Sequence, residues 1–360
     1  MSRGPRQLVR EEVLAMKAYP VAGAAGFVKL DAMENPFPLP AELAREMGER
    51  LAAVPVNRYP DPAAPRLRQR LREAMGIPEA MGLMLGNGSD EVIQIVTLAL
   101  ARPGAVVLAP EPSFVMYRLI ATALGLSYVG VPLRADFSLD VAPMLAAIRE
   151  HSPALVWLAY PNNPTGNLFD RDAMLRIIGA APGLVAVDEA YYAFSGGATF
   201  LGELGRHPNL LLVRTVSKLG LAGLRLGLAA GPLEWIAELD KLRPPYNVNV
   251  LTAAAAELLL ERSEVFAAQT AALVAERARL EHGLDRLGVA RFPSAANFVL
   301  ARLPDGPAGF EGLKARGILV RNFHGAHPLL AHCLRLTVGT PDENAQLLDA
   351  LASILGPSHA

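Results

Sequence analysis

Short apolar runs recur between residues 82 and 230, and helix-sized amphipathic stretches separate most of them. The runs occupy residues 82–85, 105–109, 127–131, 154–159, 183–187, 210–213 and 226–230. Each run has the length of one strand, and such alternation with helices predicts an α/β domain with a mainly parallel sheet covered by helices on both faces. With 360 residues, 52% of them hydrophobic, the chain can bury a large core and form two domains.

The pattern changes towards the C-terminus. A helical region over 250–287 ends at Gly288. After it, short strands near 297–302, 317–320 and 333–338 and helices near 308–316 and 341–355 predict a smaller α+β domain. Residues 1–38 are irregular and rich in proline, so we expect an N-terminal arm that joins this smaller domain. The expected division is 1–38 for the arm, 39–262 for the large domain and 263–360 for the small domain.

Composition excludes several classes of function. The formal net charge is -1 and the Lys and Arg residues are scattered, so the chain lacks the electrostatic footprint of a nucleic-acid-binding protein. A single cysteine, Cys333, excludes an internal disulfide framework, and the N-terminus lacks the features of a secretory signal. The apolar runs are too short for a bilayer. We expect a globular protein of the reduced cytoplasm with no membrane partner.

One lysine stands where an apolar run ends and glycines begin. Residues 209–213 lead into Ser217 and Lys218, glycines follow at 220, 223 and 227, and Arg225 stands seven residues after the lysine. A lysine beside a hydroxyl and an arginine suits Schiff-base chemistry on a phosphorylated aldehyde, with the serine and arginine holding the phosphate. The competing interpretation is a surface lysine in a glycine-rich loop.

Two other strand ends carry candidate ligand-binding groups. Glycines 86 and 88 precede a helix that begins near Asp90, and the free amides of such a helix start bind phosphate. Alternatively, Ser89 or Asp90 is an ordinary N-cap. Asn163 lies in the loop 160–166, where two prolines and a glycine fix the backbone at the end of the strand 154–159. We expect this loop to aim Asn163 at a bound ligand.

Aromatic and acidic residues near these strand ends suit a flat heterocycle. Asp188 ends the run 183–187, and a carboxylate there can keep a pyridinium nitrogen protonated, which makes pyridoxal phosphate an electron sink. The alternative for Asp188 is a helix N-cap. Tyr191 could bind the cofactor's phenolate oxygen, and Phe114 could stack on its ring, although both could equally be packing residues.

Arg335 alternates with apolar neighbours in the strand 333–338. A lone arginine there suits bidentate capture of a carboxylate or phosphate, and its alternative is a solvent-facing charge. His324, His327 and His332 lie in a Gly/Pro loop without an acidic or thiolate partner at ligand spacing. The sequence therefore predicts no metal site.

Taken in this order, the motifs resemble the fold-type-I pyridoxal-phosphate aminotransferases of the class II subgroup, and in detail the histidinol-phosphate aminotransferases. The resemblance covers nearly the whole chain. The motifs that carry it are Tyr19-Pro20, Glu34-Asn35-Pro36, Tyr59-Pro60-Asp61, Gly88-Ser89-Asp90-Glu91, Asn162-Asn163-Pro164-Thr165-Gly166, Asp188-Glu189-Ala190-Tyr191, Ser217-Lys218 and Leu334-Arg335-Leu336-Thr337-Val338-Gly339.

The resemblance implies roles for named residues. Lys218 would be the Schiff-base lysine, Asp188 the partner of the ring nitrogen, and Phe114 the stacking ring. Asn163 and Tyr191 would bind the phenolate oxygen. The cofactor phosphate would be held by Ser89, Asp90, Ser217, Arg225 and, from the other subunit of a homodimer with shared active sites, Tyr59. Substrate binding would fall to Tyr19, Asn35, Asn163 and Arg335. The implied reaction converts L-histidinol phosphate and 2-oxoglutarate to imidazole acetol phosphate and L-glutamate in histidine biosynthesis.

Some residues depart from the family pattern, and other functions share it. Arg225 stands seven residues after Lys218, whereas many relatives have eight, and the arm carries residues 31–35 as Asp-Ala-Met-Glu-Asn where many relatives have asparagines. An aromatic amino-acid aminotransferase of the same subgroup is the nearest alternative. A threonine-phosphate decarboxylase shares the fold and would release carbon dioxide. A non-enzymatic regulator is disfavoured because no room for a DNA-binding domain precedes residue 30.

Overall fold

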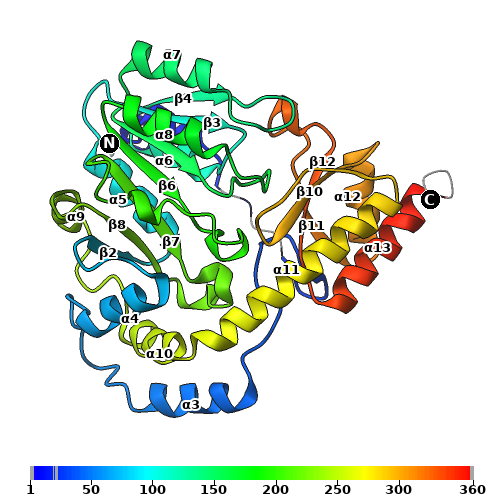
Figure 1. Ribbon diagram of the computed structural model, residues 1–360, viewed down its shortest axis with the longest axis horizontal. Coiled ribbons are helices and arrows are strands. Elements are labelled where there is room, and N and C mark those ends of the chain that lie inside the picture. Colours follow the sequence, from blue (N-terminus) through cyan, green and yellow to red (C-terminus); the bar gives the residue numbers. More distant parts are fainter. Residues whose placement is uncertain (1–3, 19, 21–22, 357–360) are drawn as a thin grey trace.

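The computed structural model describes residues 4–18, 20 and 23–356, and within these residues it contains two β-sheets (Figure 1). The larger sheet has the order β2-β8-β7-β6-β5-β3-β4. Its strands are β2 (Gly82–Gly86), β3 (Val106–Glu111), β4 (Ser127–Pro132), β5 (Leu155–Ala159), β6 (Leu184–Asp188), β7 (Leu210–Thr215) and β8 (Gly227–Gly231). Neighbouring strands are parallel, except that β8 is antiparallel to both β2 and β7. The predicted mainly parallel sheet is confirmed.

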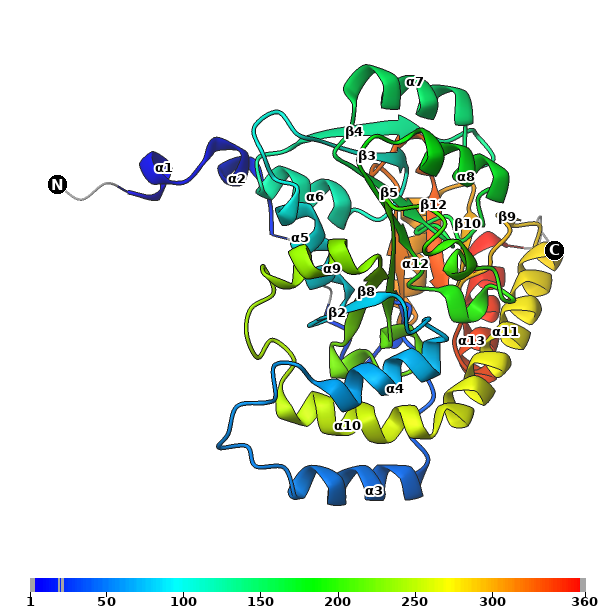
Figure 2. The ribbon, with the colours of Figure 1, turned by 60° about the vertical axis from the view of Figure 1, so that its left-hand side comes forward.

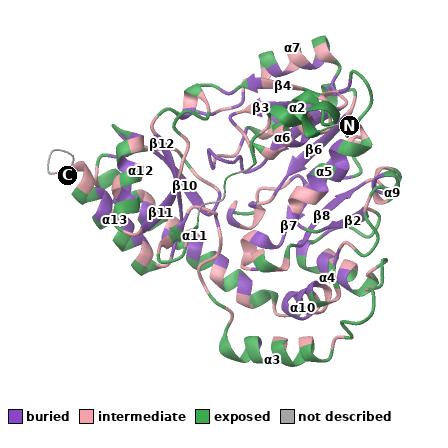
Figure 3. Ribbon diagram, turned by 180° about the vertical axis from the view of Figure 1, so that it is seen from behind, coloured by how far each residue is buried: buried purple, intermediate pink, exposed green. Residues whose placement is uncertain are grey.

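Helices cover both faces of this sheet, which explains why its strands are apolar on both sides. The central strands β5, β6 and β7 are buried along their whole length (Figure 3). One face packs against α5 (Ser89–Ala99), α6 (Met116–Ala123) and α9 (Leu233–Asp240). The other packs against α4 (Pro65–Met75), α7 (Val141–His151), α8 (Arg171–Ala180) and α10 (Val250–Glu261), and α3 (Ala41–Ala52) packs on α10. Because the backbone N–H and C=O groups of these strands are hydrogen-bonded to neighbouring strands, the strands can be buried away from water.

The smaller sheet has the order β1-β11-β12-β10-β9 and packs against three helices. Its strands are β1 (Val28–Leu30), β9 (Ala290–Arg291), β10 (Phe298–Arg302), β11 (Ile318–Asn322) and β12 (Cys333–Thr337), and the helices are α11 (Ser263–Arg286), α12 (Gly306–Ala315) and α13 (Pro341–Leu355). The elements expected after residue 290 lie within two residues of these bounds, whereas β9 was not expected. β1 pairs in parallel with β11, so the N-terminal arm supplies an edge strand.

The helical region expected over 250–287 is two helices. At Arg262 the backbone leaves the helical conformation (φ -110°, ψ 38°), and α11 starts at the next residue. The break has a packing reason, because α10 and the first turn of α11, at Phe266, bury side chains with the larger sheet, whereas the rest of α11 does so with the smaller one (Figure 1). No helix among the described residues, α11 included, is long and apolar enough to cross a membrane.

The arm predicted to be irregular contains two short helices, α1 (Pro5–Leu8) and α2 (Glu11–Ala15). Proline suits the start of α1, where its missing N–H costs no helical hydrogen bond. Figure 2 shows α1 projecting away from the rest of the molecule, with α2 beside α6. The Arg10 guanidinium donates to the carbonyl oxygen of Ala123 at the end of α6. The arm therefore runs from the larger sheet's helices to the smaller sheet.

Gly227, the first residue of β8, lies where two backbone segments touch. A Cβ there would lie 2.5 Å from the backbone nitrogen of Ser89 and 2.6 Å from the carbonyl carbon of Gly88. We predict that Gly227→Ala lowers the free energy of unfolding by about 1–3 kcal/mol, because β8 must move away from the start of α5. Gly179→Ala is the control, since an added methyl on this exposed α8 residue meets no atom within 4 Å and favours the helix. Denaturant titration of both variants checks this, and wild-type stability for Gly227→Ala would contradict it.

Candidate active site

The loops and turns at one edge of the larger sheet carry most of the predicted site residues. The parallel strands β3, β5, β6 and β7 end at this edge, as ligand-binding strands of α/β proteins do. A cavity of about 120 Å³ opens there. The predicted residues that line it are Ser89, Asp90, Phe114, Asn163, Asp188, Tyr191, Ser217, Lys218 and Arg225. The structure thus brings together side chains that are up to 136 positions apart in the sequence.

Asp188 is a buried carboxylate held by two donors. Its Oδ2 accepts from the Tyr117 hydroxyl at 2.8 Å, and its Oδ1 accepts from the Ala190 amide at 3.1 Å. Burial raises the pKa of Asp188 to about 6, although these two hydrogen bonds favour the ionised form. The carboxylate caps no helix, so the N-cap alternative is wrong. Above pH 6 it presents a fixed negative charge to the cavity.

Tyr117 is a site residue that the sequence analysis missed. It lies on α6, is fully buried, and stacks on Trp157 with ring centroids 4.9 Å apart. It also meets Phe114 edge to face at 5.6 Å. The pKa of its hydroxyl is raised, first by burial and then by the charge of Asp188, so it remains a hydrogen-bond donor. One signal was available, since a tyrosine among the apolar positions of a helix needs a partner for its hydroxyl.

Lys218 follows β7 in a single 3₁₀ turn, Ser217–Leu219, which Gly220 ends with a positive φ of 113°. Its Nζ is 3.4 Å from the carbonyl oxygen of Ala32 and 5.8 Å from the centroid of the Tyr191 ring. Burial, and after it the positive charge of Arg335, lowers the pKa of Lys218 to about 8. The lysine lines the cavity instead of the protein surface, and a lowered pKa increases the share of neutral, nucleophilic amine.

The start of α5 and Arg225 form a cradle that fits a phosphate. The N-cap residue of α5 is Gly88 and no side chain caps the helix, so the alternative of a Ser89 or Asp90 cap is wrong. Ser89 and Asp90, in the first turn of α5, line the cavity. A Cβ on Gly88 would lie 2.4 Å from Nη2 of Arg225, so the glycine makes room for the guanidinium. Arg225 adopts a left-handed conformation (φ 49°), which lets the shorter loop return to this place. Amides and a cation together suit the phosphate of pyridoxal phosphate.

Asn163 connects the cavity to the smaller sheet. Its Oδ1 accepts from Nη1 of Arg335 at 2.7 Å, and its Nδ2 lies 3.4 Å from the hydroxyl oxygen of Tyr191. Nη2 of Arg335 donates to the carbonyl oxygen of Asp31 at 2.7 Å. Arg335 is 6% exposed, so the alternative of a solvent-facing charge is wrong. An arginine of the smaller sheet is therefore held against a loop of the larger one.

A second cavity, of about 650 Å³, shares Met33, Phe114 and Asn163 with the first. Side chains from both sheets line it, among them Arg335 and Arg321. These arginines are register partners on β12 and β11, and paired residues of neighbouring strands project from the same face. Arg321 was missed because a charged residue at the end of a short strand reads as exposed.

Two of the predicted residues that the structure describes, Tyr59 and Asn35, do not line these cavities. Tyr59 is 81% exposed and stacks on Tyr246, with ring centroids 4.6 Å apart. Asn35 lies behind the lysine loop, where its Nδ2 donates to the Leu219 carbonyl at 3.3 Å and to Oε1 of Gln269 at 2.9 Å. Tyr19 lies outside the described residues. The roles assigned to these side chains stay predictions.

The three histidines of the loop after β11 accept hydrogen bonds from the backbone. Nδ1 of His324 accepts from the amide of His332, Nδ1 of His327 from that of Leu329, and Nδ1 of His332 from that of Gly306. Each imidazole thus holds a turn in place. Over the described part of the chain, no group of three or more His, Cys, Asp or Glu residues is placed to hold a metal ion.

Comparison with known proteins places the chain in a family. The family model described as aminotransferase class I and II matches residues 25–351. The chain belongs to this aminotransferase family. A histidinol-phosphate aminotransferase of Chromobacterium violaceum is 59% identical to this aminotransferase over 347 residues, covering 96% of the chain and 97% of the relative. Histidinol-phosphate aminotransferase 1 of Burkholderia lata is 55% identical, covering 96% and 98%.

A solved structure has the same fold. The histidinol-phosphate aminotransferase of Sinorhizobium meliloti, in complex with pyridoxal-5'-phosphate, matches with a TM-score of 0.86 at 24% identity, over 96% of each chain. The predicted family and the predicted fold-type-I architecture are confirmed for this aminotransferase.

The lowered pKa of Lys218 predicts a pH-dependent stability. The ordinary lysine pKa of 10.5 applies to the unfolded chain and about 8 to the folded one, so between these values the unfolded chain binds more protons. The contribution of Lys218 to the stability of the cofactor-free aminotransferase should therefore rise from pH 8 to 10.5, by up to about 3 kcal/mol. Lys218→Met should remove this rise, whereas Lys241→Met, at an exposed salt bridge, should keep it. Thermal unfolding at several pH values measures it, and equal slopes for both variants would refute the shift.

Proposed function

We propose that this protein is a histidinol-phosphate aminotransferase, which converts L-histidinol phosphate and 2-oxoglutarate to imidazole acetol phosphate and L-glutamate in histidine biosynthesis. Membership of the aminotransferase class I and II family makes it a pyridoxal-phosphate-dependent transaminase. Relatives named histidinol-phosphate aminotransferase are 55% and 59% identical over almost the whole chain. The observation that carries the substrate is the pair of arginines, Arg321 and Arg335, in the cavity next to Lys218.

Two neighbouring arginines suit a phosphorylated substrate better than an ordinary amino acid. A phosphate monoester carries close to two negative charges at neutral pH and three acceptor oxygens, which matches two guanidinium groups. A carboxylate needs one such group. The pair therefore favours a histidinol phosphate donor over the aromatic amino acids, and 2-oxoglutarate, with two carboxylates, can use the same arginines.

We propose that pyridoxal phosphate is held by residues of the smaller cavity. The amides at Ser89 and Asp90, together with Ser217 and Arg225, would bind its phosphate. The stacking ring would be Phe114, and the phenolate oxygen would face Asn163 and Tyr191. When bound, pyridoxal phosphate supplies an electron sink for the electron pair that a proton leaves behind on the substrate's amine-bearing carbon.

Two side chains of the chain would manage protons. Asp188, ionised above pH 6, would hold the proton on the ring nitrogen, and Tyr117 would fix the direction of that carboxylate. Nζ of Lys218 would bind the cofactor's aldehyde carbon at rest. When not bonded to the cofactor, the same nitrogen would be the base that takes the proton from the substrate's amine-bearing carbon and gives it back on the cofactor side.

A homodimer with shared active sites, a cytoplasmic location and the division at residues 38 and 262 are further parts of this proposal. The exposed Tyr59 on Tyr246 supports the dimer, since a large aromatic pair on a surface suits an interface. The single cysteine, Cys333, suits the reduced cytoplasm. Separate packing of the two sheets, with the helix break at Arg262, supports the domain division.

Absorbance of the purified protein tests the substrate. On addition of L-histidinol phosphate without a keto acid, the cofactor's yellow band should convert to the pyridoxamine band, because the first half-reaction leaves the amino group on the cofactor. 2-Oxoglutarate should then restore the yellow band. Lys218→Ala is the control and should not show either change.

Other outcomes would select other functions. Conversion by phenylalanine but not by histidinol phosphate would favour the aromatic aminotransferase. Carbon dioxide release from threonine phosphate, with no need of 2-oxoglutarate, would favour the decarboxylase. A protein that binds no pyridoxal phosphate would overturn the proposal altogether.

Shared active sites predict that two inactive variants complement each other. Lys218→Ala removes the amine, and Tyr59→Ala removes the contact that each subunit would lend to the other. Mixed dimers then keep one site with both residues, so co-refolding the two variants should recover roughly a quarter of wild-type activity. Each variant refolded alone is the control. No recovery from a mixture of dimeric, folded variants would argue that Tyr59 serves its own subunit or none.

A further inference from the structure

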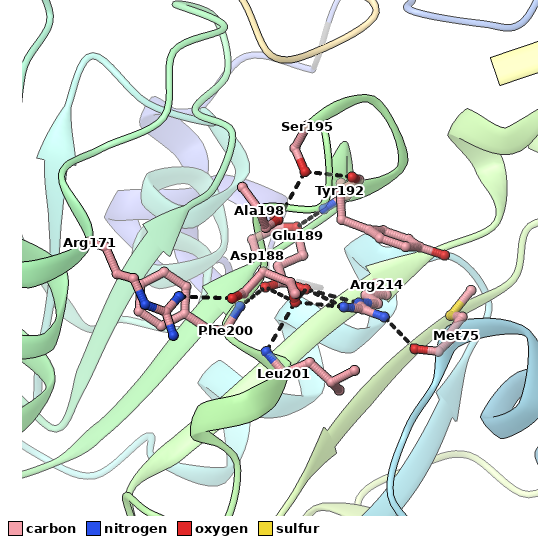
Figure 4. Close-up of polar contacts among 12 residues, drawn as sticks. Met75, Arg171, Asp188, Glu189, Tyr192, Ser195, Ala198, Phe200, Leu201 and Arg214 are labelled. Atoms are coloured by element: carbon pink, nitrogen blue, oxygen red, sulfur yellow. Dashed lines mark hydrogen bonds and ion pairs between the residues drawn. The ribbon is translucent and has the colours of Figure 1, made fainter. Parts of the chain in front are cut away.

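Next to the candidate active site, a buried ion pair joins the strand that ends at Asp188 to the strand that leads to Lys218. Glu189 follows Asp188 and is fully buried, and Arg214, on β7, is 2% exposed. Nε and Nη2 of Arg214 both donate to Oε2 of Glu189, at 2.9 and 2.7 Å (Figure 4). Neither residue lines the two cavities of the site. The pair therefore acts on the site only through its neighbours.

The pair continues the β6–β7 ladder beyond its last backbone partners. Asp188 and Val213 are the final register pair, and the Glu189 amide donates to the Val213 carbonyl at 2.8 Å. At the next step, the side chains of Glu189 and Arg214 connect the two segments. Asp188 stands just before this connection, and Lys218 stands four residues after Arg214. The connection thus cross-links the two segments that carry the carboxylate and the amine of the candidate active site.

Further contacts fix the direction of both charged groups. Oε1 of Glu189 accepts from the Phe200 amide at 2.6 Å and from the Thr199 hydroxyl at 2.9 Å (Figure 4). Nη1 of Arg214 donates to the carbonyl oxygen of Met75, the last residue of α4, at 2.7 Å, and the guanidinium carbon lies 4.0 Å from the centroid of the Tyr192 ring. A loop, a helix end and two strands meet at this one ion pair.

Stability alone does not explain such a pair. Taking two charges out of water costs more than burying apolar side chains of similar size, so a hydrophobic pair would hold the strands at least as firmly. What the ion pair adds is a fixed geometry and two charges that cancel. Both matter next to Asp188 and Lys218, whose chemistry depends on their separation and on their protonation.

We propose that Glu189 and Arg214 are positioning residues. They set the placement of Asp188 relative to Lys218, and because their charges cancel, they keep the protein interior next to the cofactor site electrically neutral. This inference rests on the proposed function, in which these two groups act on one cofactor. It predicts that removing Glu189 alone and removing Arg214 alone shift the pH midpoint of the cofactor's absorbance in opposite directions. If the pair only held the fold together, both single variants would shift this midpoint in the same direction or not at all.

The sign follows from the charge that is left behind. Glu189→Gln leaves the cation of Arg214, which favours deprotonated forms nearby, and Arg214→Gln leaves the anion of Glu189, which favours protonated forms. The other charged and titratable groups that act on Asp188 and Lys218 remain the same in every variant. They are Tyr117 and Asp90 around Asp188, and Arg335, Asp90, Glu34 and Arg225 around Lys218.

The test is a pH titration of the holoenzyme's cofactor absorbance, without substrate. The midpoint of the absorbance change should fall for Glu189→Gln and rise for Arg214→Gln, each by roughly half a pH unit or more. The double variant should return to the wild-type midpoint. Its kcat, measured with the amino donor that the wild type accepts, should stay at least about tenfold low, because the geometry is not restored. Shifts of the same sign, or none, would overturn the inference.

Two more variants separate placement from stability. Arg214→Lys keeps the charge and loses the fork of the guanidinium, so it should keep the wild-type midpoint and lower kcat. Arg171→Met removes a half-exposed arginine that bonds Oε1 of Glu203 at 2.7 Å on the outer side of the same loop. It should lower the melting temperature of the cofactor-free protein without moving the midpoint. A midpoint shift in Arg171→Met equal to that in Arg214→Gln would also overturn the inference.

The two proposals can fail separately. A wild-type protein that leaves histidinol phosphate unconverted refutes the proposed substrate, while the spectral midpoints still decide the role of the pair. Normal conversion by the wild type, with unchanged midpoints in the variants, refutes the role of the pair alone.

Discussion

A sheet that is covered by helices on both faces can hold polar side chains mainly at the ends of its strands. This constraint determines where the site of this molecule lies. Helices cover both sides of β5, β6 and β7, so these strands are buried, and their only ionisable side chains, Asp188 and Arg214, stand near their carboxyl ends. The carboxyl ends of the parallel strands then become the place where loops can hold Asn163, Asp188 and Lys218 close together. The same burial shifts their pKa values, raising that of Asp188 and lowering that of Lys218. The burial of the sheet therefore determines both where the site residues gather and how their pKa values are shifted.

The smaller sheet completes the site with positive charge. Arg335 reaches Asn163 and the backbone of Asp31, and Arg321 stands beside it in the ladder. Because these arginines come from β11 and β12, the larger cavity exists only between the two sheets. The groups proposed to bind the cofactor thus lie mainly on the larger sheet, and the two arginines proposed to bind the substrate's negative charge lie on the smaller one. A substrate that spans the two must carry an amine at one position and a negative charge at another.

Features that produce a local sequence pattern could be predicted from the sequence. Apolar runs located the strands of the larger sheet almost to the residue, because a strand buried on both faces reads as one uninterrupted run. Motifs at strand ends located Lys218, Asp188 and Asn163. Residues whose role depends on a partner far away in the sequence could not be predicted in this way. Tyr117 was not predicted, because the partner of its hydroxyl, Asp188, lies 71 residues later in the sequence. The break at Arg262 was hidden because both helices have the composition of one, and only their different packing partners separate them.

The position of β1 has a consequence for the order of events during synthesis. β1 (Val28–Leu30) is made long before its partner β11 (Ile318–Asn322). On the ribosome, this strand must wait with its edge unpaired while the larger sheet is completed. Closing so long a loop is slow, since its entropy is spent before the strand gains any contact. Until β11 has been made, the edge of β1 therefore has no partner strand in the smaller sheet.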